Sequence, residues 1–282
     1  MAEQNAAQER AEEIWRTYLT TGYPPDYMEV PWYMGPTVRP WLGRLPSNPR
    51  CQLCAAPFGG AGGTLVRLTL RLAPSRLNPR ICDLCDRFIQ EHQGGAEVDV
   101  TVLFADVRGS TRIAQTMRPA EFSQLINRFF VAASDALHRH QGLVEKLIGD
   151  EVTAFFVSGT AGPNHQRVAL EAAKDILHAT GHGGPKEPWV PVGIGVHSGT
   201  AYVGSVGKPN GAAEIVVLGD VPNTGARLAG AAAPGEILAS GVTIQRAGWD
   251  CAGLEQRELE LKGHDAPLSA WVLAPATSLL PM

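Results

Sequence analysis

The sequence predicts an α+β protein in which a small cysteine-bearing module precedes a larger domain. Two C-x-x-C pairs stand in the first third of the chain, a glycine pair follows at residues 94–95, and beyond it the apolar pattern alternates between strand and helix periods. With 282 residues, 44% of them hydrophobic, the chain can bury a sizeable core and has a prior of about two domains. We expect an N-terminal helix and arm over residues 1–49, the cysteine module over 50–95 and the larger domain over 96–275.

The first segment opens with an amphipathic helix over residues 8–20. Its apolar stripe follows the helical repeat and faces away from an acidic surface: Ala11, Ile14, Trp15, Tyr18 and Leu19. We expect the stripe to pack on this protein or on a second copy of it, because a membrane-surface helix would carry basic residues on its polar face. Residues 21–49 combine many prolines with aromatic residues, which predicts an extended arm lying on a surface.

The second segment holds four cysteines, Cys51, Cys54, Cys82 and Cys85. They supply four soft ligands, the number that a tetrahedral structural zinc site needs. An iron–sulfur or redox dithiol site and cysteines without metal stay open as alternatives, while disulfides are not expected in a reducing cytoplasm. The gap between the pairs exceeds the usual ~15–20 residues, so we expect the alternating run over residues 64–72 to form a ribbon strand. The lone Cys251 is interpreted as core filler.

Charge and hydropathy limit the binding partners and the cell compartment that the sequence predicts. Residues 36–90 are locally basic, with eight arginines against two acids, but they lack the lysines and aromatic residues typical of nucleic-acid binding. The net charge of −4 gives no general attraction to nucleic acid. No stretch reaches the ~18 apolar residues of a membrane helix, and the N-terminus lacks a signal-peptide layout. We expect a soluble cytoplasmic protein without membrane or nucleic-acid partners.

Beyond residue 95 the elements are expected in a fixed order. The apolar pattern predicts a strand over 98–104, a helix over 119–140, a hairpin over 143–157, a helix over 164–180, and strands near 190–197, 201–206 and 215–218. A helix over 222–231 and short strands towards Trp271 complete the domain. A strand, a helix, a hairpin, a helix and a further strand resemble a ferredoxin-like core with additions.

Two aspartates stand where these strands end. Asp106 lies just past the strand over 98–104, ahead of a turn that leads into a helix. Asp150 occupies the tip of the hairpin, between Gly149 and Glu151. One such aspartate is ordinary turn chemistry, whereas two in one α/β domain fit the two-metal arrangement used for phosphoryl chemistry.

Three blocks of this domain resemble the signature blocks of class III nucleotidyl cyclases. They are FADVRGST at residues 104–111, KLIGD at 146–150 and GDVPNTGAR at 219–227, and they occur in the family's order. The resemblance covers roughly residues 97–273. It implies the ferredoxin-like cyclase palm with added strands and helices, and an adenylyl cyclase that converts ATP to 3′,5′-cyclic AMP and pyrophosphate. The glycine-rich run over 193–207 resembles the family's strand-turn-strand segment, and His197 is interpreted as structural.

The resemblance also implies the catalytic groups. Asp106, Asp150 and the backbone carbonyl of Val107 would hold two Mg²⁺ or Mn²⁺ ions, which activate the 3′-hydroxyl and hold the triphosphate for in-line attack on the α-phosphorus. Asn223 would orient the ribose, and Arg227, four residues along the same predicted helix, would neutralise charge on the α-phosphate. In the family these groups come from two subunits, so a homodimer with two shared sites is implied.

Base selection depends on Lys146 and Val216. The Lys146 ammonium donates only, so it suits an adenine ring nitrogen, whereas guanylyl members of the family carry Glu there. The second base-reading position, usually Asp or Thr, falls on Val216, which departs from the family's pattern. Either selectivity between ATP and GTP is relaxed, or another residue such as Glu214 reads the base. A catalytically weak nucleotide-binding sensor or scaffold is the alternative function.

Overall fold

The computed structural model describes residues 2–25, 38–45, 47, 49–51, 53–207, 213–260 and 267–277. Within the predicted arm, residues 26–37, 46 and 48 lie outside the described residues. The chain divides into two compact units, and each unit is built from three separate segments of the sequence. The first contains Met1–Asp99, Val157–Pro163 and Thr200–Leu218, and the second contains Val100–Phe156, Asn164–Gly199 and Gly219–Met282.

In the first unit, helix α1 (Ala2–Thr21) is the predicted amphipathic helix, extended at its N-terminus. All five residues of its apolar stripe are buried, which confirms that the stripe packs within the protein. The Trp15 ring nitrogen donates a hydrogen bond to the His92 carbonyl (2.7 Å), and the ring meets Phe88 edge-on. Helix α1 is therefore fixed on helix α4 (Asp83–Glu91), which starts at the second cysteine pair. None of the described helices is both long and apolar enough to cross a membrane.

The segment before the first cysteine pair contains one short helix, α2 (Arg39–Arg44), rather than a wholly extended arm. Pro40 stands in its first turn, where a proline removes no helical hydrogen bond. Leu42 and the Arg39 side chain are buried, whereas Trp41 is exposed. The helix thus contributes an arginine, as well as an apolar side chain, to the interior of the first unit.

The predicted ribbon strand over residues 64–72 is wrong, because most of this run is helical. Helix α3 (Gly60–Leu70) covers it, with only Gly62, Gly63 and Val66 buried. A side chain at Gly63 would collide with the Phe58 backbone (2.4 Å), so the glycine lets the helix approach it closely. Alternating Leu, Arg and Thr residues fit a helix as well as a strand, and this packing decides between the two.

Strand β4 (Val192–Gly207) corrects a second prediction, since it is one continuous strand where we expected two strands and a turn. None of its glycines at 193, 195, 199 and 204 has the positive φ that a tight turn would need. They serve close packing instead: a side chain at Gly204 would meet the Gly94 carbonyl at 2.4 Å. In the first unit, the second half of β4 pairs with β5 (Ala213–Leu218).

In the second unit a mixed sheet runs in the order β2-β3-β1-β4-β6-β8-β7. Strands β2 (Leu143–Ile148) and β3 (Glu151–Phe156) form the predicted hairpin, and β3 lies antiparallel to β1 (Gly95–Val107). Strand β4 is parallel to β6 (Ile237–Ser240). The sheet is completed by antiparallel β8 (Leu268–Leu273) and β7 (Gln256–Leu259).

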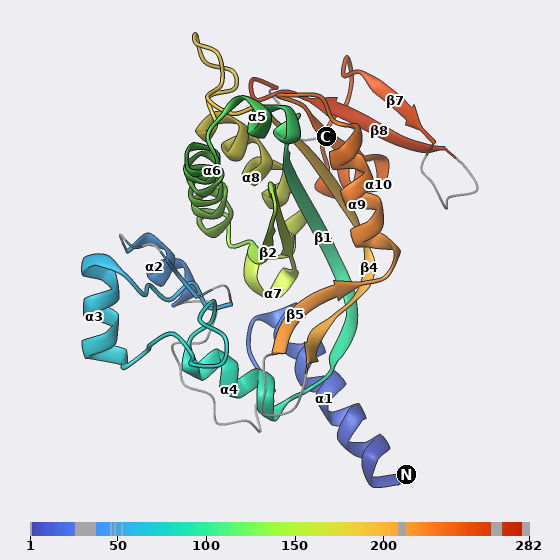
Figure 1. Ribbon diagram of the computed structural model, residues 1–282. Coiled ribbons are helices and arrows are strands. Elements are labelled where there is room, and N and C mark those ends of the chain that lie inside the picture. Colours follow the sequence, from blue (N-terminus) through green and yellow to red (C-terminus); the bar gives the residue numbers. More distant parts are fainter. Residues whose placement is uncertain are drawn as a thin grey trace. The chain divides into compact units, whose positions relative to one another are not determined.

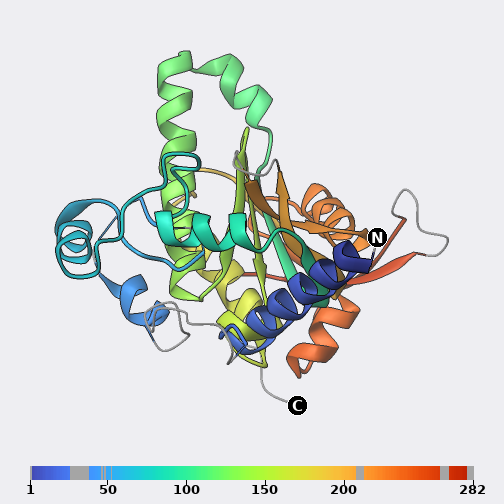
Figure 2. The ribbon, with the colours of Figure 1, turned by 90° about the horizontal axis from the view of Figure 1, so that it is seen from below.

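Helices cover both faces of this sheet (Figures 1 and 2). Helices α6 (Pro119–Arg139) and α8 (His165–Ala179) lie on one face and confirm the two long predicted helices, while α9 (Asp220–Ala231) lies on the other. Successive side chains of β1 point to opposite faces of the sheet. Thr101 bonds to His165 of α8 on one face, whereas Val102 and Phe104 face α9 on the other. By the same period of two, Asp106 belongs to the α9 face. Short helices α5 (Ser110–Thr116), α7 (Ser158–Ala161) and α10 (Gly241–Ala247) connect the elements.

Helix α9 rests unusually close to the sheet. A side chain at Gly195 of β4 would meet the Ala229 nitrogen at 2.2 Å, and one at Gly225 of α9 would meet Val102 at 2.7 Å. Farther along the helix, Leu228 and Ala232 pack against Leu238 of β6 in the core. Because backbone approaches backbone here, the position of α9 on the sheet is tightly fixed.

On the face of the sheet opposite α9, hydroxyl groups of strand residues bond to one another and to a residue of α10. Ser198 of β4 bonds to Thr101 (2.8 Å) and accepts from Thr243 of α10 (3.0 Å). Ser240 in turn bonds to Thr243 (2.9 Å) and to Nδ1 of His197 (2.8 Å). The hydrogen bond of His197 agrees with its interpretation as a structural histidine.

Candidate active site

Acidic residues gather where β1 ends beside the β2–β3 hairpin. The β1–β3 register pairs Asp106 with Glu151, and the Val107 amide donates to the Asp150 carbonyl (3.2 Å). The hairpin tip is thereby held against the end of β1. The structure thus brings together Asp106, Val107 and Asp150, and it adds Glu151, which the sequence analysis did not select. The sequence feature that could have identified Glu151 is its position directly after Asp150 in a tight hairpin.

These carboxylates repel one another. Burial raises the pKa of Asp106, the charge of Asp150 raises it further, and the Arg108 guanidinium partly offsets both effects. Burial also raises the pKa of Glu151 to about 7, aided by the charges of Asp106 and Asp150. Burial is the larger cause of both shifts, and the like charges add to it; a divalent cation with oxygen ligands would offset the like-charge part. The donor set therefore fits Mg²⁺ or Mn²⁺.

Arg108 is a second residue that the sequence analysis did not single out. Its Nη1 forms an ion pair with the Asp106 carboxylate (2.6 Å) and donates to the Ala229 carbonyl (3.2 Å), while Nη2 donates to the Gly230 carbonyl (2.8 Å). These carbonyls belong to the last turn of α9, where the helix dipole favours a cation. Arg108 thus connects the end of β1 to the C-terminal end of α9.

Helix α9 also carries two more of the predicted site residues. Asn223 is exposed, and its side-chain amide donates to the Gly219 carbonyl (3.2 Å). Arg227, one turn later, is half-buried, and its side chain makes no hydrogen bond or ion pair within the described residues. In the described part of the chain neither residue bonds to Asp106 or Asp150.

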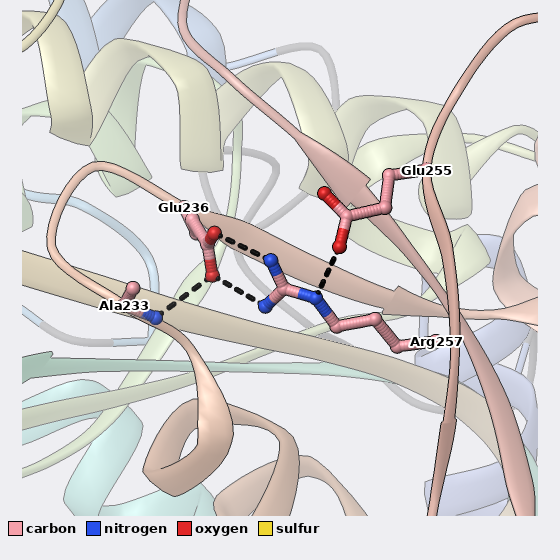
Figure 3. Close-up of polar contacts among 4 residues, drawn as sticks. All are labelled: Ala233, Glu236, Glu255 and Arg257. Atoms are coloured by element: carbon pink, nitrogen blue, oxygen red, sulfur yellow. Dashed lines mark hydrogen bonds and ion pairs between the residues drawn. The ribbon is translucent and has the colours of Figure 1, made fainter.

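A clamp holds the loop that follows α9 (Figure 3). Arg257 of β7 donates to both carboxylate oxygens of Glu236 (2.8 Å each), and its Nε donates to Glu255 (2.7 Å). Glu236 also accepts from the Ala233 amide (2.9 Å), two residues beyond the end of α9. The Arg257 hydrogen bonds are the main reason that the pKa of Glu236 is lowered. Strand β7 thereby fixes the exit of α9.

The two predicted base-reading residues lie in different units. Lys146 of β2 is one-third exposed and lies 3.7 Å from the Glu145 carboxylate, next to an irregularity in the β2–β3 register. Val216 of β5 is buried and pairs with Gly204, while its neighbour Glu214 is exposed. Burial of an apolar side chain at residue 216 leaves no polar group there to read a base.

The four cysteines of the first unit form a compact cluster. Cys51, Cys54, Cys82 and Cys85 are buried and free, and their sulfur atoms all lie within 4.8 Å of one another. Among the described residues it is the one group of three or more His, Cys, Asp or Glu side chains whose ligand atoms all lie this close together. The grouping predicted from the two C-x-x-C pairs is confirmed. Cys251, by contrast, is half-buried rather than a core residue.

The larger, C-terminal part of the chain matches a known enzyme family. Residues 94–274, more than half of the chain, match the model of the adenylate and guanylate cyclase catalytic domain. The chain belongs to this family. The structure of this cyclase domain agrees: the guanylyl cyclase Cya2 is similar with a TM-score of 0.57 and 25% identity, over 64% of this chain and 93% of that one. The adenylyl cyclase CyaB from P. aeruginosa gives 0.54 and 22%, over 64% and 95%.

Curated relatives share the cyclase domain but are longer proteins. Rv1318c of Mycobacterium tuberculosis is 34% identical over 183 residues, and Rv1320c is 35% identical over 179 residues; both carry the description uncharacterized protein. Each match covers 62% of this chain and about a third of the relative. The family and the α+β cyclase fold are thus established, and the chain carries a nucleotide cyclase domain of the adenylyl or guanylyl type.

Proposed function

We propose that this protein is an adenylyl cyclase, which converts ATP to 3′,5′-cyclic AMP and pyrophosphate. The observation that carries the proposal is the acidic cluster at the end of β1, where Asp106 pairs with Glu151 in the β1–β3 register and the Val107 amide holds Asp150 beside them. Family membership supports it, as does the presence of Asn223 and Arg227 on α9.

The proposed metal ligands are Asp106, Asp150 and the backbone carbonyl of Val107. When bound there, two Mg²⁺ or Mn²⁺ ions supply charge neutralisation for the triphosphate and acidify the attacking 3′-hydroxyl. The raised pKa values of Asp106 and Glu151 agree with this assignment, because burial and the neighbouring carboxylates disfavour their charged forms and a bound cation would favour them. Binding at Asp106 requires the Arg108 guanidinium to share or leave that carboxylate.

The groups on α9 would act on the nucleotide directly. Asn223 would orient the ribose, and Arg227 would stabilise negative charge that grows on the α-phosphate, a task suited to a guanidinium that is always charged. Arg227 has no partner among the described residues, so it is available for an anion. Since neither residue bonds to the acidic cluster of its own chain, we propose a homodimer in which each site combines the aspartates of one subunit with the α9 groups of the other.

Adenine would be selected by Lys146. A donor-only ammonium suits an adenine ring nitrogen, whereas the N1–H of guanine would face a second donor. The buried valine at 216 adds only apolar contact, and a missing polar contact corresponds to roughly 1–3 kcal/mol. A cyclase with relaxed selectivity between ATP and GTP is therefore the nearest variant of the proposal.

A second candidate function is a catalytically weak cyclase-like domain that binds nucleotide as a sensor or scaffold. Two observations favour it: Val216 replaces the usual polar base-reading residue, and Arg108 occupies the Asp106 carboxylate at 2.6 Å. In either case we propose that the cysteine cluster holds a structural Zn²⁺.

The deciding experiment supplies the purified full-length protein with ATP or GTP, first with Mn²⁺ and then with Mg²⁺, and measures cyclic products. Cyclic AMP from ATP with little cyclic GMP from GTP supports the proposal. Comparable yields of both products indicate relaxed selectivity. Nucleotide binding without any cyclic product overturns the enzyme proposal in favour of the sensor.

A further inference from the structure

A guanidinium is buried beside the four cysteines. Arg39 is only 3% exposed, and its Nε donates to the carbonyl of Leu53, which lies within the first C-x-x-C pair (3.0 Å). Burial lowers the pKa of the Arg39 guanidinium, and the nearby Tyr18, Cys54, Cys51 and Cys85 act in the opposite direction. A buried cation is costly unless negative charge and hydrogen bonds compensate it.

The spacing of the sulfur atoms indicates one metal ion. Cys54 Sγ and Cys82 Sγ are 3.7 Å apart, and all four sulfurs lie within 4.8 Å of one another. With Zn–S bonds of about 2.3 Å, the edge of a regular tetrahedron is about 3.8 Å. A disulfide would require about 2.05 Å. In a polynuclear iron–sulfur cluster the cysteines attach to different irons, which spreads their sulfurs farther apart.

The backbone around the cluster is arranged for negatively charged sulfur. The Cys82 amide donates to Cys51 Sγ (3.2 Å), the Cys54 amide donates to the same sulfur (3.5 Å), and the Cys85 amide donates to Cys82 Sγ (3.4 Å). Cys82 is also the N-cap residue of α4, where the helix dipole favours an anion. Four thiolates around a divalent ion keep a net charge of −2, which a nearby cation would stabilise further.

We propose that Cys51, Cys54, Cys82 and Cys85 bind a single Zn²⁺ as thiolates and that Arg39 is the built-in counter-charge of this centre. The inference rests on the structural zinc proposed above, and it adds a residue that no cysteine motif contains. In this arrangement the metal centre supplies negative charge beside the buried Arg39, and Arg39 helps to hold α2 on the module. Loss of the metal should therefore release α2.

The test compares full-length variants of two arginines from the same helix. Arg39→Met removes the charge and keeps much of the apolar volume, and Arg39→Lys keeps the charge. The matched control is Arg44→Met, since Arg44 is exposed and stacks over Trp41. Zinc content by elemental analysis and competition with a chromophoric chelator give the affinity. We expect Arg39→Met to weaken Zn²⁺ binding at least tenfold, Arg39→Lys to weaken it less, and Arg44→Met to leave it unchanged.

A second measurement does not depend on how Arg39→Met folds. In wild-type protein, Co²⁺ in place of zinc should give the thiolate charge-transfer and d–d bands of a tetrahedral Co(Cys)₄ site. A single ion per chain supports the proposal, whereas more than one iron per chain together with acid-labile sulfide would overturn it. So would wild-type protein that binds neither Zn²⁺ nor Co²⁺, or Arg39→Met protein with wild-type zinc affinity. These readouts need no nucleotide turnover, so failure of the cyclase proposal would leave them unaffected.

Discussion

Arg108 forms an ion pair with Asp106 across 2.6 Å, and the same guanidinium donates to the Gly230 carbonyl at the end of α9 (2.8 Å). One side chain thus joins the carboxylate that we propose as a metal ligand to the helix that carries Asn223 and Arg227. In a dimer with shared sites, those two features would serve different active sites. Arg108 is therefore placed to affect both.

The first prediction concerns Arg108→Ala. Removing the guanidinium leaves Asp106 with less competition for a cation, so Mn²⁺ binding to the nucleotide-free protein should tighten severalfold, as measured by Mn²⁺ electron paramagnetic resonance titration. Losing hydrogen bonds to the last turn of α9 should cost about 1–3 kcal/mol in the free energy of unfolding. Arg112→Ala, at an exposed position of α5, is the control and should change neither quantity. Unchanged Mn²⁺ affinity in Arg108→Ala would contradict the competition.

The second prediction tests the shared sites. Asp106→Ala and Arg227→Ala should each abolish or greatly reduce cyclase activity, because one removes a proposed metal ligand and the other the proposed charge stabiliser. When the two inactive proteins are mixed, a heterodimer contains one site with both defects and one intact site. Activity should recover to at most about half of the wild-type value per dimer. If no activity returns although heterodimers form, the sites are not shared in this way.

The third prediction concerns base selection. Lys146→Glu replaces a donor with an acceptor, which should favour the N1–H of guanine over the ring nitrogen of adenine. We expect the ratio of kcat/KM for ATP to that for GTP to fall at least tenfold, as about 1.4 kcal/mol would produce. Lys186→Glu makes the same charge change at an exposed position and should leave the ratio unaltered. An unchanged ratio of the two kcat/KM values in Lys146→Glu would show that Lys146 does not recognise the base.

The fourth prediction concerns the Glu236–Arg257 clamp. The pKa of Glu236 is lowered in the folded state, so its contribution to stability is fully present above its unfolded pKa and is lost as the pH falls through the folded value. Glu236→Gln should cost about 1 kcal/mol of unfolding free energy at pH 7, and less in acid. Chemical denaturation at pH 7 and pH 4 measures both. Glu255→Gln, at a more exposed partner of the same arginine, should cost less. Equal losses at the two pH values would show that the ion pair does not stabilise the fold.

The sequence alone was sufficient for features that depend on local period and spacing. The α1 stripe, helices α6 and α8 and the β2–β3 hairpin follow from apolar periodicity, because burial of one face requires that pattern. The three signature blocks identified the family, and the cysteine spacing predicted the cluster of the first unit.

Tertiary packing decided the remainder. Residues 64–70 are helical because Gly63 lets α3 approach the Phe58 backbone, and β4 is continuous because its glycines serve close contacts instead of turns. The contacts of Arg108 and Arg39 also could not be predicted from the order of residues in the sequence. Each guanidinium donates to a backbone carbonyl of another segment, and only the folded chain brings the two groups within hydrogen-bonding distance.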